Sequence, residues 1–244
     1  MEITWYGHSC FRITERSIAT VVTDPFDSGI VGYHPLKLKA EIVTVSSNDL
    51  SHNNISVVKG NPFVIEGPGE YERGGVFLTG IQTTPLKSEN KELRNTIYVL
   101  DYGSITVLHL GQTNMVPSQT MIEELGNINI ALVPVGSGGG LNASKAAEVI
   151  SMLEPNIVIP MHYETPYSKL ELDPGPLFDH IGIDTGKESA GKRSKALASR
   201  CFNALGLLRV DLLRQTGKTS SKSGHQIGID CPGGNNFQDL IQRY

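Results

Sequence analysis

The feature that most constrains this chain is a β-branched run that stops abruptly in a loop of small polar residues. Residues 41–45 read Glu-Ile-Val-Thr-Val, and residues 46–54 read Ser-Ser-Asn-Asp-Leu-Ser-His-Asn-Asn. The first segment is typical of a buried strand. Ligands and catalytic groups of layered α/β proteins gather at such strand ends, where a loop can aim side chains from a rigid support. Asp49 and His52 are three residues apart, so both can face one ion.

The order of the predicted elements indicates the fold class. Most strands come in the first half, and helices alternate with strands in the second, which predicts an α/β (α+β) protein with four αββα layers. Residues 28–32 and 86–94 are expected to be loops. The helices are expected at 117–125 and at 143–153, where Asn142 can cap the start. Strands are predicted at residues 3–6, 10–13, 18–23, 41–45, 55–58, 63–65, 75–79, 96–100, 104–110, 128–135 and 157–161.

The last quarter of the chain has a different composition. From Asp184 onward there are ten Lys/Arg and five Asp/Glu, a net charge of +5, whereas the remainder has 11 and 20, a net charge of −9. We therefore expect a domain at 1–183 and a divergent basic tail at 184–244, partly helical or disordered. Only residues 196–213 have a helix-like apolar pattern. A shifted reading frame is an alternative origin for this segment.

Composition excludes several classes of protein. No apolar run approaches the roughly 20 residues of a membrane span, and the first residues lack the pattern of a signal peptide. Three widely spaced cysteines argue against disulfides and against a cysteine-type zinc site, which fits a cytoplasmic protein. A net charge of −4 argues against nucleic acid as a partner. Only the basic tail supports nucleic-acid processing, which is a third and weaker hypothesis.

The loop at 47–52 resembles a degenerate copy of the His-x-His-x-Asp-His signature of the metallo-β-lactamase superfamily. Ser47 and Asp49 stand at the two first histidines, Ser51 stands at the aspartate, and His52 matches the last histidine. Four further segments resemble the lactonase-like branch, the small zinc-dependent hydrolases similar to ascorbate-6-phosphate lactonase. The resemblance runs from Met1 to about Asp184, and the four segments are Trp5–Phe11, Thr23–Phe26, Gly67–Glu72 and Pro160–Pro166.

The resemblance implies which residues serve a metal. His162 stands at the last histidine ligand, His8 beside the metal, and Asp24 at a strand-end aspartate that orients a ligand histidine. Asp49 can supply an oxygen ligand in place of imidazole. Gln112 stands where the family has its bridging carboxylate, and the strand end at 79–85 lacks the expected histidine.

These losses argue against two metal ions. We predict one ion at most, held by Asp49, His52 and His162, with His8 as a further candidate ligand. Zinc is the expected metal, with manganese or iron as alternatives, and a fold that has lost its ion is the competing reading. His8, Asp24 and Gln112 are the predicted catalytic residues.

Several of these residues also have a possible structural role that needs no metal. His52 can cap the following turn, and His8 can form a buried structural pair with Asp24. His109 is expected in the core or behind the site, whereas His34, His180 and His225 are expected at the surface. The glycine-rich segment 136–140 is either an anion cradle or a flexible loop.

The sequence supports two functions of different kinds. The first is a metal-dependent hydrolase that uses an activated water on a small ester, lactone or phosphoester, anionic substrates included. The second is a catalytically silent protein of the same fold that binds a small ligand or a partner through the same cleft. The oligomeric state is not predicted.

Overall fold

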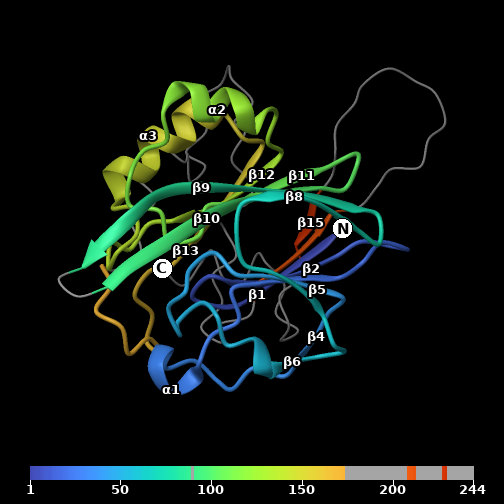
Figure 1. Cartoon of the computed structure of the whole chain (residues 1–244), viewed down its shortest axis with the longest axis horizontal. Helices are drawn as coiled ribbons and strands as arrows, with labels where there is room; N and C mark the ends of the chain where they lie inside the picture. Colours follow the sequence, from blue (N-terminus) through green and yellow to red (C-terminus); the bar gives the residue numbers. More distant parts are fainter. Residues whose placement is uncertain (89–90, 174–207, 213–226, 230–244) are drawn as a thin grey trace, which may run out of the picture.

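Two β-sheets face each other and helices lie outside them. The computed structural model describes residues 1–88, 91–173, 208–212 and 227–229. In Figure 1, α2 and α3 lie over the outer face of one sheet and α1 lies on the opposite side of the molecule. This is the predicted αββα order, and the fold class is confirmed.

The elements alternate as the residue patterns predict. The helices are α1 (Ser28–Val31), the 3-10 helix η1 (Ile55–Val57), α2 (Gln119–Leu125) and α3 (Ala143–Leu153). The strands are β1 (Glu2–Gly7), β2 (Cys10–Thr14), β3 (Val21–Thr23), β4 (Leu38–Lys39), β5 (Ile42–Thr44), β6 (Val58–Lys59), β7 (Phe63–Ile65), β8 (Gly69–Arg73), β9 (Val76–Ser88), β10 (Lys91–Asp101), β11 (Thr106–His109), β12 (Ile130–Pro134), β13 (Ile157–Met161), β14 (Leu208–Leu212) and β15 (Ile227–Ile229).

The seven-stranded sheet holds the strands that lead into the predicted site. Its order is β15-β14-β1-β2-β3-β5-β7. Strand β1 buries every second residue, as a strand with one face toward the core must. Strands β3, β5 and β7 are parallel, so their carboxyl ends meet at one edge of the sheet.

The six-stranded sheet has the order β13-β12-β11-β10-β9-β8. All five residues of β12 are buried, which is typical of a central parallel strand covered on both faces. Strands β9 and β10 form a long hairpin that runs through Ser88 and Lys91. The predicted loop at 86–94 is therefore wrong, because backbone pairing overrides the polar composition there.

Two smaller predictions are also wrong. Residues 28–31 form the helix α1 rather than a loop, because the Asp27 side chain accepts a hydrogen bond from Gly29 N–H and caps its start. Residues 55–57 form the 3-10 helix η1, and only the pair Val58–Lys59 continues as strand. The two later helices begin at the caps Ser118 and Asn142, whose side chains accept backbone N–H groups.

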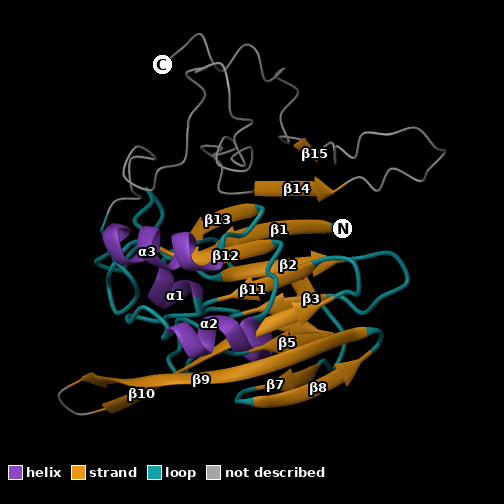
Figure 2. Cartoon of the chain, turned by 90° about the horizontal axis from the view of Figure 1, so that it is seen from above, coloured by secondary structure: helices purple, strands orange, loops and turns teal. Residues whose placement is uncertain are grey.

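The C-terminal quarter contributes strands to the first sheet. Leu208–Leu212 was expected at the end of a helix-like segment, but it forms β14, antiparallel to β1 (Figure 2). Strand β15 pairs with β14 in turn. Unpaired edge groups of β1 favour such strand addition over a helix. The rest of the predicted tail at 184–244 lies outside the described residues.

Tyr98 on β10 joins the two sheets. Its side chain is fully buried, and its hydroxyl donates toward the carbonyl oxygens of Val45 at 2.9 Å and Ile65 at 3.2 Å. Val45 follows β5 and Ile65 ends β7, so a side chain of one sheet bonds the backbone of the other. No helix in the described part of the chain is long and apolar enough to cross a membrane.

Candidate metal site

Three strands end directly before residues of the site, and a fourth leads into the loop that carries another. Strand β1 ends before His8, β3 before Asp24 and β13 before His162, while β5 leads into the 45–54 loop that carries His52. Strands β1 and β3 belong to the seven-stranded sheet and β13 belongs to the six-stranded sheet, so the site lies where the two sheets meet. Residues from distant parts of the sequence therefore converge at one end of the sandwich.

Three of these residues have a strained backbone. The φ angles of His8, Asp24 and His162 are +51°, +41° and +54°. Residues other than glycine seldom adopt this left-handed region, and when they do the strain concentrates at functional sites. The turn after each strand thus aims its side chain back into the space between the sheets, at a cost that the surrounding packing must offset.

The imidazoles of His8, His52 and His162 form one cluster. Each offers a nitrogen, and these nitrogens all lie within 4.8 Å of one another. The ring centroids of His8 and His162 are 4.3 Å apart, and those of His8 and His52 are 4.8 Å apart. The three side chains are 0%, 0% and 1% exposed.

The cluster leaves buried nitrogen atoms without hydrogen bonds. Both ring nitrogens of His8, Nε2 of His52 and Nδ1 of His162 have no partner in the described structure. A buried polar atom without a partner is costly, so native structures seldom retain one that nothing else satisfies. Lone pairs gathered in one buried space fit a metal ion chemically.

Asp24 fixes the orientation of His52. Its Oδ2 lies 2.9 Å from Nδ1 of His52 and accepts a 2.5 Å bond from the Ser46 hydroxyl, while Oδ1 accepts the Ser46 N–H at 2.7 Å. A carboxylate in this state only accepts, so Nδ1 of His52 carries the proton. Nε2 is left with its lone pair facing His8 and His162, as a metal ligand requires.

The protonation states follow from burial. Burial lowers the pKa of His8 well below its usual value, and it lowers the pKa of His162 to about 3; the neighbouring imidazoles act in the same direction. Burial alone would raise the pKa of Asp24, but His109, His52 and Ser46 together lower it. The neutral forms of His8 and His162 and the ionised form of Asp24 are therefore favoured, and these are the states that metal binding needs.

His109 supports the site from behind. It is fully buried, its Nε2 lies 3.0 Å from the Ser9 carbonyl oxygen, and its Nδ1 accepts the Gly111 N–H at 3.2 Å. Nε2 is also 3.9 Å from the Asp24 carboxylate. This placement matches the expectation of a core residue behind the site. His34 is exposed, as expected, whereas His180 and His225 lie outside the described residues.

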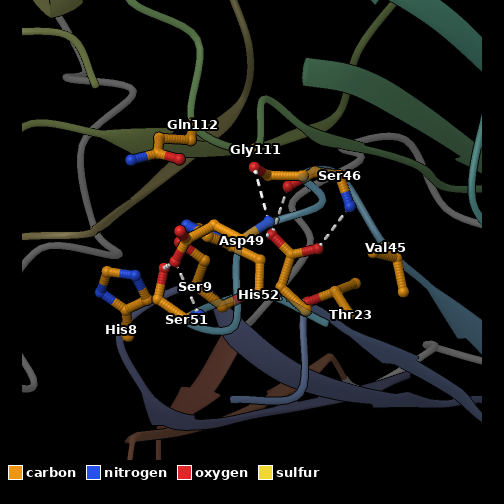
Figure 3. Close-up of polar contacts among 12 residues, drawn as sticks. His8, Ser9, Thr23, Val45, Ser46, Asp49, Ser51, His52, Gly111 and Gln112 are labelled. Carbon is orange, nitrogen blue, oxygen red and sulfur yellow. Dashed lines mark hydrogen bonds and ion pairs between the residues drawn. The ribbon is translucent and has the colours of Figure 1, made fainter. Parts of the chain in front are cut away.

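Asp49, a predicted ligand, has a different set of contacts. Its Oδ1 accepts the Ser51 N–H at 2.9 Å and the Ser51 hydroxyl at 2.7 Å, an interaction drawn in Figure 3. Among the described residues, the group that shares a potential ion consists of His8, His52 and His162, without Asp49. The Asp49 carboxylate, predicted from the sequence to bind the metal, is thus hydrogen-bonded to Ser51.

Gln112 lies beside the cluster, next to the glycine-rich loop. Its Nε2 donates to the Gly138 carbonyl oxygen at 3.3 Å, and its Oε1 is buried without a partner. A Cβ on Gly139 would come within 2.6 Å of Nε2, and one on Gly140 within 3.5 Å of Nδ1 of His162. Gly139, with a φ of +95°, is thus the position where a side chain would be strained, whereas the distance at Gly140 is an ordinary contact.

Two residues of the site escaped the sequence analysis. Ser46 holds both oxygens of Asp24, and Asn95 accepts the Gln112 N–H at 2.7 Å while its amide donates to the Leu110 carbonyl oxygen. Ser46 carries a usable signal, since it is the first polar residue after a buried strand. Asn95 carries none, because its role depends on the pairing of β9 with β10.

The geometry can accept one tetrahedral ion after small side-chain movements. Ligand nitrogens about 2.1 Å from zinc in a tetrahedral site are about 3.4 Å apart, compared with the 4.8 Å limit here. Three imidazoles leave a fourth position open, which is the arrangement of catalytic rather than structural zinc sites. His8, His52 and His162 are the residues that could hold the ion.

The facing sheets, the outer helices and the histidines at strand ends define a metallo-β-lactamase fold. Residues 2–162 match the family described as the Beta-lactamase superfamily domain. The match covers more than half of the 244 residues, so the chain belongs to this family.

The match to two relatives covers most of the length of those proteins. A UPF0173 metal-dependent hydrolase of Lysinibacillus sphaericus is 28% identical over 209 residues, which cover 71% of this chain and 89% of that protein. A UPF0173 metal-dependent hydrolase of Bacillus cereus is 28% identical over 222 residues, which cover 77% and 96%.

Solved structures agree on the fold. A proposed zinc-dependent hydrolase of the metallo-β-lactamase superfamily from Thermotoga maritima superposes with a TM-score of 0.61 and 35% identity, covering 76% of this chain and 86% of that one. A metallo hydrolase from Ignicoccus hospitalis superposes with a TM-score of 0.54 at 16% identity, covering 67% and 84%, and it shows the fold alone.

Proposed function

We propose that the protein is a hydrolase that uses a single metal ion held by His8, His52 and His162. The observation that carries this proposal is the cluster of buried ring nitrogens without hydrogen bonds, all within 4.8 Å of one another. Zinc is the proposed metal, with manganese or iron as alternatives. The names of the UPF0173 relatives and of the Thermotoga maritima structure support metal-dependent hydrolysis.

The chain itself supplies orientation and shielding. A bound zinc ion would supply Lewis acidity and an activated water near neutral pH. Asp24 accepts the Nδ1 proton of His52 and keeps Nε2 available. The glycine-rich loop 136–140, which packs against Gln112 and His162, limits the access of solvent. The Gln112 amide, no longer a carboxylate, is a hydrogen-bonding group for a substrate and carries no charge.

We propose a small ester, lactone or phosphoester as the substrate. Support for an anionic group comes from loop 136–140, where Ser137, Gly138 and Gly139 have φ angles of +54°, +53° and +95°. Successive residues of this kind can turn their N–H groups toward an anion. Within the described chain, the N–H groups of Gly138 and Gly139 take part in none of the backbone hydrogen bonds of loops and turns.

The substitutions in the signature loop favour one ion over two. Ser47 and Ser51 are poor zinc ligands, and Gln112 cannot offset the charge of a second ion. The Ser51 hydroxyl donates instead to Asp49. A single-ion site therefore uses His8, which the resemblance puts beside the metal, as the third imidazole.

A second function, a catalytically silent binding protein, is favoured by the burial of the cluster. The three imidazoles are at most 1% exposed, so a substrate must displace part of the surrounding loops to reach them. In such a protein the cleft would bind a small ligand or a partner without turnover, with or without an ion.

Metal content and turnover together separate the two functions. Elemental analysis of protein purified without chelator is expected to find about one equivalent of zinc, manganese or iron. Less than about a tenth of an equivalent, with no binding on titration, contradicts the metal-dependent hydrolase and leaves the silent alternative. Hydrolysis of p-nitrophenyl acetate, homoserine lactone or bis-p-nitrophenyl phosphate that is lost in His52→Ala and kept in His34→Ala supports the enzyme. A loaded protein without turnover on any ester, lactone or phosphoester tested supports the silent alternative.

A further inference from the structure

A second polar cavity lies on the other face of the loop that carries His52. Its volume is about 500 Å³, within the range of pockets that hold small molecules. Three parts of the chain line it: residues 45–48 with Asn53, the turn at 66–68, and the facing strands β9 and β10. None of the three clustered histidines lines it, although Ser46, which holds Asp24, lies in its wall, so the cavity adjoins the candidate metal site without containing the imidazoles.

The cavity is lined by two opposite charges. Glu66 and Arg94 both line it and both are exposed to solvent. Among the side chains of residues 1–83 and 94–173, neither one makes an ion pair with the other or with any further group. The remaining lining is mostly amides and hydroxyls, and only Val45 and Pro68 are apolar. A ligand that is apolar, or that carries charge of one sign only, would leave part of this lining unmatched.

Asn53 helps to fix the wall of the cavity. It donates its Nδ2–H to the Asn48 carbonyl oxygen at 3.1 Å, while its Oδ1 is buried away from solvent and therefore from a ligand. The amide of Gln82, on the opposite wall, can accept or donate.

We propose that this cavity binds a small zwitterion with a free ammonium and a free carboxylate, namely an α-amino acid or a short peptide. The Arg94 guanidinium receives the carboxylate, for which its planar fork is suited, and the Glu66 carboxylate receives the ammonium. The amide of Gln82 hydrogen-bonds the polar part between the two ends. The proposal does not depend on the metal site or on hydrolysis.

The first test compares ligands that differ in one charge. Isothermal titration of the full chain with L-glutamine and with alanyl-glutamine distinguishes an amino acid from a peptide as the ligand. Saturable binding of either one is expected, with at least tenfold weaker binding of its C-terminal amide and of its N-acetyl derivative. Equal affinity for the charged and the capped compounds, or no binding of any zwitterion in a panel of free amino acids and dipeptides, overturns the proposal.

The second test uses matched charge removals. Glu66→Gln and Arg94→Gln each remove one charge from the cavity, whereas Glu70→Gln and Arg73→Gln remove equivalent exposed charges on β8, outside the cavity lining. We expect the first pair to weaken binding at least tenfold and the second pair to leave it within twofold. Circular dichroism confirms that all four variants fold. An equal effect of both pairs shows a general charge effect and contradicts a built site.

Discussion

The backbone N–H of His162 donates a hydrogen bond to the carbonyl oxygen of His8, 3.2 Å away. The indole N–H of Trp5 donates to the same oxygen at 3.0 Å. His8 follows a strand of one sheet and His162 follows a strand of the other, so this contact joins the two halves of the sandwich at the site. The backbone geometry therefore places the two imidazoles near each other without the help of a metal.

Removing one histidine of the cluster should weaken metal binding strongly. His8→Ala, His52→Ala and His162→Ala each delete one of three nitrogens, and we expect zinc affinity to fall at least about a hundredfold, beyond the cost of losing a supporting partner. Competition against a chromophoric chelator measures the affinity. His34→Ala, which removes an exposed histidine, is the control and should bind zinc normally. Equal loss in the control would contradict the assignment.

Asp24→Asn should act through His52. The amide can no longer hold the Nδ1 proton as an ionised carboxylate does, so we expect about 10- to 100-fold weaker zinc binding with the fold retained. Nitrogen-15 NMR of the imidazole reports the tautomer directly, and a mixture of tautomers is expected. Asp101→Asn, at the end of β10, should change neither the zinc affinity nor the tautomer. An unchanged tautomer in Asp24→Asn would be inconsistent with the orienting role.

The metal-free protein should lose stability in acid because of its buried imidazoles. The pKa of His162 is lowered to about 3 and that of His8 is lowered well below its usual value. The unfolded chain takes up these protons near pH 6.5 and the folded chain does not, so this contribution is complete above about pH 6.5 and declines below it. The slope is about 1.4 kcal/mol per pH unit for each proton.

Urea unfolding of metal-free protein at pH 7.5 and at pH 5 measures this decline. The His162→Ala variant serves as the comparison, since it removes one of the two titrating rings and should show a shallower dependence. A stability that increases on acidification from pH 7.5 to pH 5 would mean that the imidazoles gain protons on folding.

Tyr98→Phe should loosen the contact between the sheets. It removes the hydroxyl that donates toward two buried carbonyl oxygens, and we expect a loss of about 1–2 kcal/mol in the free energy of unfolding. The hydroxyl of Tyr71 bonds the Gly67 and Pro68 carbonyl oxygens at a more exposed position, so Tyr71→Phe should cost less. Chemical denaturation of both variants makes the comparison. A larger loss in Tyr71→Phe would be evidence against the role of Tyr98.

Gly111→Ala should destabilise the turn that precedes Gln112. The φ angle is +59°, and a Cβ would come within 2.4 Å of Asn95 Oδ1 and 2.5 Å of Ser46 Cβ. We expect a loss of about 2–4 kcal/mol from strain and crowding combined. Gly103 has a φ of +81° with no atom within 4 Å of such a Cβ, so Gly103→Ala isolates the strain term. Similar unfolding free energies for the two variants would show that crowding at Gly111 is relieved.

Sequence patterns anticipate the parts of the fold that local chemistry determines. Helix α3 begins and ends as predicted because Asn142 caps it and its apolar face repeats at helical spacing. The hairpin of β9 and β10 could not be predicted in full, because its length depends on pairing between polar strands. Strand β14 forms by addition to the edge of β1, a long-range event that residues 208–212 do not encode locally.

The candidate site shows the same division. The positions of His8, Asp24, His52 and His162 at strand ends follow from the strand pattern and the resemblance. The resemblance also implies that Asp24 orients a ligand histidine, but it leaves open which one, and the structure pairs Asp24 with His52 and leaves both nitrogens of His8 without a bond. Asp49 bonds Ser51 and does not join the three imidazoles, and this depends on a turn geometry that spacing alone leaves open.

Tyr98 has one more consequence. Its hydroxyl donates a hydrogen bond to the carbonyl oxygen of Val45, in the peptide group immediately before Ser46. Ser46 in turn donates hydrogen bonds to both carboxylate oxygens of Asp24. A displacement of the six-stranded sheet relative to the seven-stranded sheet would therefore shift the Asp24 carboxylate, which orients His52. Relative motion of the two sheets would thus move the imidazole cluster. Rigid packing between the sheets is therefore a condition for a well-ordered arrangement of the three histidines.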